Sequence, residues 1–193
     1  MNIILTEETS VDFKTFDRWD EGIWNKVSPI YQGAFGDKGA KPEKVIRNMF
    51  RKQICFLHVA FQQDLPVGLA LTGKLKGINA LLIDYIAVDH DKQGHGIGSK
   101  ILQFIKDWST SEEGIDSIVI EVESEMSAEN QERIHFWKKN GFTLTDYIHR
   151  YIWVPETYQA MYLQLSSHGV VPEGGEELFK FIGNFHKESF QGT

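Results

Sequence analysis

The chain has 193 residues, of which 41% are apolar and 12% aromatic, and 20 basic against 27 acidic residues give a net charge of −7. This length and apolar content fit a single folded domain and exclude a disordered or fibrous protein. The acidic balance argues against a general affinity for nucleic acid or for an anionic membrane, because either partner requires a concentrated basic face.

Two helices are predicted early in the chain, after a short apolar strand at residues 2–5. Aromatic and aliphatic residues recur at steps of three and four over residues 16–31, which is the spacing of an amphipathic helix. A turn-rich segment with three glycines follows. Pro42 then suits the first turn of a second helix at residues 43–52.

A block of strands comes next. Residues 54–62 and 67–72 are apolar strands separated by a turn, and residues 81–88 are the most continuously apolar run in the chain. Such a run is typical of a strand covered on both faces. A glycine-rich segment, a helix with its apolar residues between 97 and 108, and a strand at residues 118–123 follow. This order predicts a βαβ unit with parallel strands and a right-handed crossover.

The last third is predicted to hold a helix, two strands and a terminal helix. The first helix covers residues 130–139 and ends at Asn140-Gly141. Strands are predicted at residues 142–148 and 158–165, and residues 176–186 have the spacing of an amphipathic helix. The fold class that follows is mixed α/β, with antiparallel strands around one central βαβ unit.

The sharpest local feature is the glycine loop, defined here as residues 93–99, with the sequence Gln93-Gly94-His95-Gly96-Ile97-Gly98-Ser99. Glycines let a backbone approach a ligand closely, and a following helix adds unpaired N–H groups and the positive end of its dipole. A simpler interpretation is a tight strand-to-helix turn that needs glycine. Three glycines in five residues after a buried strand favour a phosphate or pyrophosphate site.

Two common phosphate motifs do not fit the glycine loop. A P-loop requires glycine and lysine before its serine or threonine, whereas Lys100 follows Ser99 with no glycine directly before it. A dinucleotide fingerprint counted from Gly94 needs glycine where Ser99 stands, and it normally follows the first strand of a domain. A nucleotide-binding oxidoreductase is therefore a distant alternative.

Two stretches resemble the signature motifs of the GNAT N-acyltransferase superfamily. The run Gln93-Gly94-His95-Gly96-Ile97-Gly98 matches motif A, Gln/Arg-x-x-Gly-x-Gly/Ala, and the run Asn130-x-x-Arg133-x-x-Phe136-Trp137-x-x-x-Gly141-Phe142 is similar to motif B. The resemblance covers roughly residues 2–165. It implies a central, mostly antiparallel sheet of six to seven strands, flanked by helices, with one parallel βαβ unit. The implied organisation is a GNAT domain at residues 1–165 and a helical C-terminal extension at residues 166–193.

The resemblance implies acetyl-CoA as co-substrate. Its pyrophosphate would bind the backbone of the glycine loop, and its pantetheine arm would lie between the strand edge at residues 86–88 and the side chain of Asn130. In the family, the thioester and the acceptor amine meet in a V-shaped gap between two strands, which end here near Val88 and Glu123. The residues implied in binding acetyl-CoA are Ile86, Ala87, Val88, Gln93, Gly94, His95, Gly96, Ile97, Gly98, Ser99, Asn130 and Trp137.

Two carboxylates are candidate catalytic residues, because acyl transfer to an amine requires a base. Glu121 interrupts an apolar strand beside the implied gap, and period-two alternation places it on the face of Val119 and Glu123. Asp84 interrupts another apolar run, where a charge is costly unless it is paired, hydrated or useful. Two alternatives stay open: Glu121 on a solvated strand face, and Asp84 in a structural ion pair.

Trp137 departs from motif B, which usually carries a tyrosine that is often assigned as the acid for the departing thiolate. An indole N–H donates a hydrogen bond but is not an acid near neutral pH. Water, Tyr85, Tyr147 or His135 would have to supply that proton. The favoured function is an N-acetyltransferase that moves the acetyl group to a primary amine of a small molecule or peptide by direct transfer in a ternary complex. The alternative is a non-catalytic acyl-CoA-binding or regulatory module.

Composition also bears on partners and location. The seven histidines show no paired metal spacing, so no metal site is expected. One cysteine cannot form an internal disulfide, and no apolar run approaches the roughly 20 residues of a transmembrane helix. A cytoplasmic protein that binds neither membrane nor nucleic acid is predicted. Its partners would be an acyl-CoA and an amine acceptor, and a homodimer is left open.

Overall fold

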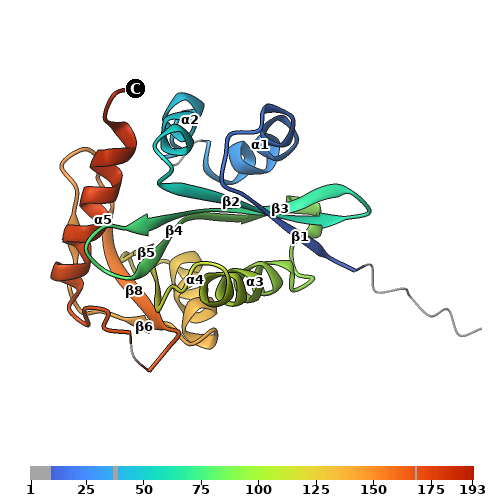
Figure 1. Cartoon of the computed structure of the whole chain (residues 1–193). Helices are drawn as coiled ribbons and strands as arrows, with labels where there is room; N and C mark the ends of the chain where they lie inside the picture. Colours follow the sequence, from blue (N-terminus) through green and yellow to red (C-terminus); the bar gives the residue numbers. More distant parts are fainter. Residues whose placement is uncertain (1–9, 37–38, 168) are drawn as a thin grey trace, which may run out of the picture.

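The structure is a computed structural model that describes residues 10–36, 39–167 and 169–193, and this part of the chain forms one eight-stranded sheet with helices around it (Figure 1). The strands are β1 (Asp12–Phe16), β2 (Cys55–Gln62), β3 (Leu65–Leu75), β4 (Ala80–Val88), β5 (Ser117–Glu123), β6 (Thr143–Leu144), β7 (His149–Arg150) and β8 (Thr157–Gln164). The helices are α1 (Glu21–Phe35), α2 (Glu43–Arg51), a short 3-10 helix (His90–Lys92), α3 (Ile97–Ser111), α4 (Ala128–Lys139) and α5 (Gly175–Phe190).

The sheet is mixed, as predicted. Its strands run in the order β1-β2-β3-β4-β5-β8-β6, and β7 also pairs with β8. The pair β4 and β5 is parallel and is connected through α3, whereas the other paired strands are antiparallel. This arrangement confirms the mixed α/β class with a single βαβ unit.

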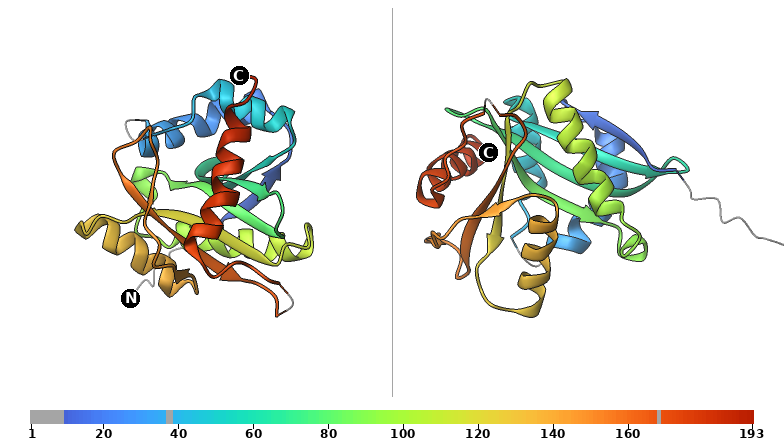
Figure 2. Two further views of the ribbon diagram at one scale, coloured as in Figure 1. Left: turned by 90° about the vertical axis from the view of Figure 1, so that its left-hand side faces the viewer. Right: turned by 90° about the horizontal axis from the view of Figure 1, so that it is seen from below.

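Helices cover both faces of the sheet. Figures 1 and 2 show α1, α2 and α5 on one face and α3 and α4 on the other. Buried apolar side chains accordingly form two clusters, which we call the α2–α5 core and the α3–α4 core after the helices that cover them. In the part of the chain that the structure describes, no helix combines the length and apolar character needed to cross a membrane.

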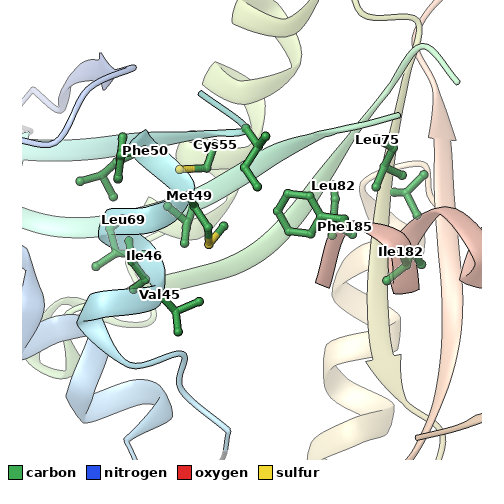
Figure 3. Packing of buried hydrophobic residues seen from close by; sticks show 14 of the residues in the cluster. Val45, Ile46, Met49, Phe50, Cys55, Leu69, Leu75, Leu82, Ile182 and Phe185 are labelled. Carbon is green, nitrogen blue, oxygen red and sulfur yellow. The ribbon is translucent and has the colours of Figure 1, made fainter. Parts of the chain in front are cut away.

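The α2–α5 core joins the terminal helix to the middle of the sheet. Figure 3 shows side chains of α2 and α5 gathered over β2, β3 and β4. The ring of Phe185 lies so close to Gly73 of β3 that a Cβ atom at residue 73 would be 2.1 Å from Phe185 Cε2. Glycine at this position therefore lets α5 approach the sheet. The expected limits of two units, residues 1–165 and 166–193, stay a prediction.

The N-terminal elements differ from those predicted. The strand expected at residues 2–5 lies outside the described residues, and β1, which the sequence did not predict, pairs along β2. The helix expected from residue 16 begins at Glu21 instead. Phe16 ends β1, and Asp20 caps α1 by accepting a hydrogen bond of 2.9 Å from the Ile23 N–H. The regular spacing of aromatic residues extends to Phe16, on the other side of the Asp20 cap, because Phe16 also packs against the α2–α5 core although it belongs to β1.

The strand expected at residues 142–148 is shortened to β6 in the structure, and a second short strand, β7, lies beyond the expected range. Strand β6 pairs with the middle of β8, whereas β7 pairs with the start of β8. Between them, the Thr145 hydroxyl donates to the Ala160 carbonyl at 2.9 Å, and the chain then leaves the sheet. The two short strands β1 and β7, which were not predicted, raise the strand count above the expected six to seven. The other predicted elements differ from the structure only at their ends.

A buried histidine on β2 makes stability depend on pH. His58 is fully buried, and its Nδ1 and Nε2 atoms lie 2.8 Å and 2.9 Å from the hydroxyls of Thr15 and Thr72. Burial lowers the pKa of His58 to about 3. Because the unfolded chain takes up this proton near pH 6.5, the stabilisation is complete above pH 6.5 and is lost as the pH falls toward 3.

We therefore expect the free energy of unfolding to be about 2 kcal/mol lower at pH 5 than at pH 7.5 through His58 alone. Urea denaturation of the wild type and of His58→Gln at both pH values measures this contribution. The glutamine side chain keeps hydrogen-bonding groups but does not titrate, so the variant should lose that part of the pH dependence. An equal pH dependence in the two proteins would contradict the assignment.

Candidate active site

The parallel strands β4 and β5 separate partway along their length. They pair from Ala80 with Ser117 to Ile83 with Ile120, after which β4 continues to Val88 and β5 to Glu123 without pairing to each other. We call the point of separation the vertex. The two strands therefore form the V-shaped arrangement that the motifs imply.

Both candidate carboxylates lie at the vertex. Asp84 is the first residue of β4 beyond the paired segment, and Glu121 is the first residue of β5. The register between β3 and β4 also shifts here, because Leu71 pairs with Tyr85 whereas Thr72 pairs with Ile83. Asp84 is thus the extra residue of a β-bulge, a feature that re-aims side chains and is common next to active sites.

Residues 86–88 of β4 offer one backbone edge to a ligand. Ile86, Ala87 and Val88 pair with β3 on one side, while the pairing with β5 on the other side ends at Ile83. Peptide groups on that second edge therefore face the opening between the strands. An extended amide chain such as a pantetheine arm could add there as a strand does.

The glycine loop leads from the end of β4 into α3. Gly94 and Gly96 have φ values of 78° and 74°, in the left-handed region that favours glycine, and a Cβ at either would meet no atom of the described residues within 4 Å. Gly96 is the N-cap of α3, so the N–H groups of the first turn have no carbonyl acceptor within the helix. Open space, free donors and the positive end of the helix dipole fit a pyrophosphate.

The remaining residues of the loop hold it against the strand. The Gln93 side chain donates to the Val88 carbonyl at 3.3 Å, and Nδ1–H of His95 donates to the Gln93 carbonyl at 2.8 Å. Ile97 is buried in the α3–α4 core and anchors the first turn of α3. A Cβ at Gly98 would lie 3.7 Å from Val88 Cγ2, and Ser99 is exposed.

Asn130 and Trp137, the residues of α4 that are implied in binding acetyl-CoA, have different surroundings. Asn130 is buried, its amide donates to the Glu125 carbonyl at 3.2 Å, and its Oδ1 accepts from Arg133 at 3.3 Å. Trp137 is also buried, and its ring packs edge-to-face on Phe142 with centroids 5.0 Å apart. The indole therefore contributes to the α3–α4 core. A role for either residue in binding acetyl-CoA stays a prediction.

Glu121 faces α5 and is held by two short hydrogen bonds. Its side chain is only 16% exposed, so it does not lie on a solvated strand face. Tyr151 OH donates to Oε2 and His186 Nε2 donates to Oε1, each at 2.6 Å. Burial by itself raises the pKa of this carboxyl group. The hydrogen bond and electrostatic attraction of His186, then the hydrogen bond from Tyr151 and the charge of Lys41, outweigh burial and hold the pKa of Glu121 below its ordinary value.

Asp84 forms an ion pair with a buried lysine. The Nζ atom of Lys41 lies 2.7 Å and 2.6 Å from the two carboxylate oxygens of Asp84, and each side chain is 4% exposed. The ammonium also lies over the rings of Tyr85 and Phe185, 5.1 Å and 5.7 Å from their centroids. The structural ion pair weighed for Asp84 is thus present.

Sequence reasoning missed three residues of this site: Lys41, Tyr151 and His186. Lys41 and Tyr151 lie outside regular elements, where no periodicity marks a residue. His186 follows Ile182 by four positions on a predicted amphipathic helix, so it shares the apolar face of that helix. That placement was a usable signal, but the helix lies beyond the stretch that resembles the family.

Separated parallel strands beside a glycine loop define an acyltransferase that uses an acyl-CoA. Residues 53–144 match the model of the Acetyltransferase (GNAT) domain. Similar solved structures include the ribosomal-protein-S18-alanine N-acetyltransferase from Escherichia coli, with 20% identity, a TM-score of 0.64 and coverage of 83% of this chain and 97% of that chain. A GNAT-family acetyltransferase from Bacteroides thetaiotaomicron has 19% identity, a TM-score of 0.68 and coverage of 91% and 94%. An acetyltransferase from Salmonella typhimurium with acetyl-CoA has 17% identity, a TM-score of 0.62 and coverage of 83% and 98%.

None of the curated proteins matches this chain significantly in sequence. The solved structures share its fold, and the family model covers the strands β2 to β6, the glycine loop and both motifs. The chain contains a GNAT acetyltransferase domain over residues 53–144. It is an acyltransferase, and its co-substrate is acetyl-CoA.

Proposed function

We propose that the protein transfers the acetyl group of acetyl-CoA to a primary amine of a small molecule or peptide, directly and within a ternary complex. The observation that carries this proposal is the position of the Glu121 side chain at the vertex, held by Tyr151 and His186 beside the backbone edge of β4. A carboxylate at that position can bind an ammonium group and take its proton while the amine faces the thioester.

The co-substrate would be held at three places. The N–H groups of the glycine loop and of the first turn of α3 would bind the pyrophosphate. Residues 86–88 would pair with the pantetheine arm, and Asn130 would contact the arm from the side of α4. The open Cβ positions of Gly94 and Gly96 support the first contact, and the end of the β4–β5 pairing at Ile83 supports the second.

In the proposed transfer, Glu121 accepts a proton from the substrate ammonium, directly or through one water molecule. The amine nitrogen then forms a bond to the thioester carbon, and the nitrogen gives up its second proton to water. The C–S bond breaks, and the CoA thiolate leaves and takes a proton from water. Glu121 is favoured over Asp84 as the base because Asp84 is in direct ion-pair contact with the Lys41 ammonium and its side chain is 4% exposed. The Glu121 oxygens each accept one hydrogen bond, from Tyr151 and His186, and its side chain is 16% exposed. One lysine and two carboxylates leave a negative charge at the vertex, which favours a cationic acceptor.

The proton for the thiolate is assigned to water. Trp137 cannot supply it, and Tyr85 OH is engaged with the Lys41 N–H at 3.1 Å and with the Gly39 carbonyl at 2.9 Å. A thiolate is a good enough leaving group for transfer to proceed without a placed acid. A non-catalytic acyl-CoA-binding module is the outcome that remains if no acceptor reacts.

A panel of primary amines tests the proposed function. The panel should contain small polyamines and peptides with a free N-terminus, the latter because one similar structure is named for an alanine of ribosomal protein S18. We expect CoA release with formation of an amide, and initial-velocity plots that intersect, as a ternary complex requires. Parallel plots would contradict direct transfer. Tight binding of acetyl-CoA without turnover of any amine would favour the binding module.

A further inference from the structure

A continuous chain of polar side chains crosses the vertex from β4 to the segment after β7. It runs Asp84, Lys41, His186, Glu121, Tyr151, and its links measure 2.6 Å, 3.3 Å, 2.6 Å and 2.6 Å. Its members come from β4, the segment before α2, α5, β5 and the segment after β7. His186 is the central link, and it lies outside the region that matches the family model.

The hydrogen-bond donors among these five side chains determine which nitrogen of His186 carries the proton. A lysine ammonium has only donors, so the contact between Lys41 Nζ and His186 Nδ1 requires an unprotonated Nδ1. The ring proton is therefore on Nε2, and it is donated to Glu121. Lys41 is itself held in place, because its N–H donates to Tyr85 OH and its carbonyl accepts from Tyr31 OH.

This arrangement orients Glu121 through two hydrogen bonds without placing the Lys41 ammonium in direct contact with its carboxylate. The neutral imidazole contributes a hydrogen bond and no net charge, and Tyr151 does the same from the other oxygen. Burial, and then the neighbouring Glu121 carboxylate, raise the pKa of Tyr151, so the phenol keeps the proton that it donates. The carboxylate thus remains an anion in one orientation, with its charge available to a substrate ammonium.

The packing of α5 on the sheet does not explain why residue 186 is a histidine. Leu178, Phe179, Ile182 and Phe185 already bury the apolar face of α5 in the α2–α5 core. The imidazole is 17% exposed and reaches past this core to the vertex. Its substitution should therefore leave α5 docked on the sheet.

We propose that His186 is a positioning residue for Glu121, so that the C-terminal helix completes the active site. This inference rests on the proposed function, in which Glu121 accepts the proton of the amine. Lys41 selects the imidazole tautomer, and the imidazole fixes the carboxylate. The ring does not itself exchange a proton with the substrate, because Lys41 covers Nδ1 and Glu121 covers Nε2.

Two substitutions separate positioning from proton exchange. In His186→Gln, the amide N–H can donate to Glu121 and the amide oxygen can accept from Lys41, so kcat should stay within a few-fold of wild type. In His186→Leu, both contacts are lost, and kcat should fall by about 10- to 100-fold while acetyl-CoA affinity is unchanged. Ser189→Ala is the matched control, because its hydroxyl is buried on the same helix and donates to the Phe185 carbonyl at 2.9 Å.

The pH profile gives a readout that a merely structural role would not move. A carboxylate that loses a hydrogen-bond donor has a higher pKa, so the acid limb of kcat/KM should shift to higher pH in His186→Leu and stay in place in His186→Gln. The ionisable groups that interact with Glu121 are His186, Tyr151, Lys41, His149 and Tyr158, and Asp84 is the ion-pair partner of Lys41. The positioning role is wrong if His186→Gln is as inactive as His186→Leu, or if His186→Leu keeps the wild-type kcat and acid limb.

NMR on the protein without an acceptor keeps this test independent of the proposed function. We expect ¹⁵N shifts of His186 that show a proton on Nε2, and a ¹³C titration of Glu121 whose pKa rises in His186→Leu but not in His186→Gln. An unchanged Glu121 pKa in His186→Leu would overturn the positioning role. Failure of every amine to react would overturn the proposed function, and the NMR result would still decide the role of His186.

Discussion

Replacing Glu121 with glutamine should lower kcat by about 10²–10⁴-fold, because the amide keeps the shape of the side chain but cannot accept the proton of the amine. Acetyl-CoA affinity should stay near the wild-type value, since Glu121 lies at the vertex and not in the glycine loop. The acid limb of the pH profile, which reports the base, should also disappear. Steady-state kinetics with the best amine and calorimetric titration with acetyl-CoA measure these effects.

Glu123→Gln is the matched control for this substitution. Glu123 lies two residues further along the same face of β5, is 30% exposed and approaches Arg133 at 3.9 Å. Its loss should leave kcat within a few-fold of wild type. If Glu121→Gln turns over normally, the base is not Glu121, and Asp84→Asn becomes the next variant to measure. If neither variant loses activity, water or the substrate itself removes the proton.

Replacing Gly96 with aspartate should weaken acetyl-CoA binding by at least about 100-fold. A carboxylate at the N-cap of α3 would repel a pyrophosphate bound to the same N–H groups, and two unit charges about 4 Å apart repel by about 4 kcal/mol near a protein surface. Aspartate at the left-handed φ of 74° also strains the backbone, so a second variant with the same strain and no charge is needed as the control. Thermal-shift and calorimetric titrations with acetyl-CoA measure the loss.

Gly96→Asn separates charge from backbone strain. Asparagine has nearly the same size as aspartate, caps helices equally well and tolerates the left-handed φ of 74° at this position. It should therefore bind acetyl-CoA more tightly than Gly96→Asp by at least about tenfold. Equal affinities in the two variants would show that the backbone, and not the charge, decides binding. Wild-type affinity in Gly96→Asp would place the pyrophosphate elsewhere.

Local patterns in the sequence predicted most of the elements near the site. The apolar run of β4, the three glycines and the apolar spacing of α3 specify a strand, a loop and a helix through interactions a few residues apart. The start of α1 was misplaced because the aromatic pattern continues across Asp20, and only the cap shows where the helix begins. The early end of β6 and the short strand β7 were missed because residues 143–150 mix polar and apolar side chains with no clear boundary, and only the pairing with β8 shows where each strand lies.

By itself, the sequence determined the fold class, the glycine loop and the position of Glu121 on one face of its strand, because periodicity and turn chemistry act over short distances. Only the tertiary structure decided what surrounds Glu121. The hydrogen bonds that join Lys41 to His186 and His186 to Glu121 span 145 and 65 positions of the chain. Such contacts depend on the order of the strands in the sheet and on where α5 docks, and no local pattern encodes either.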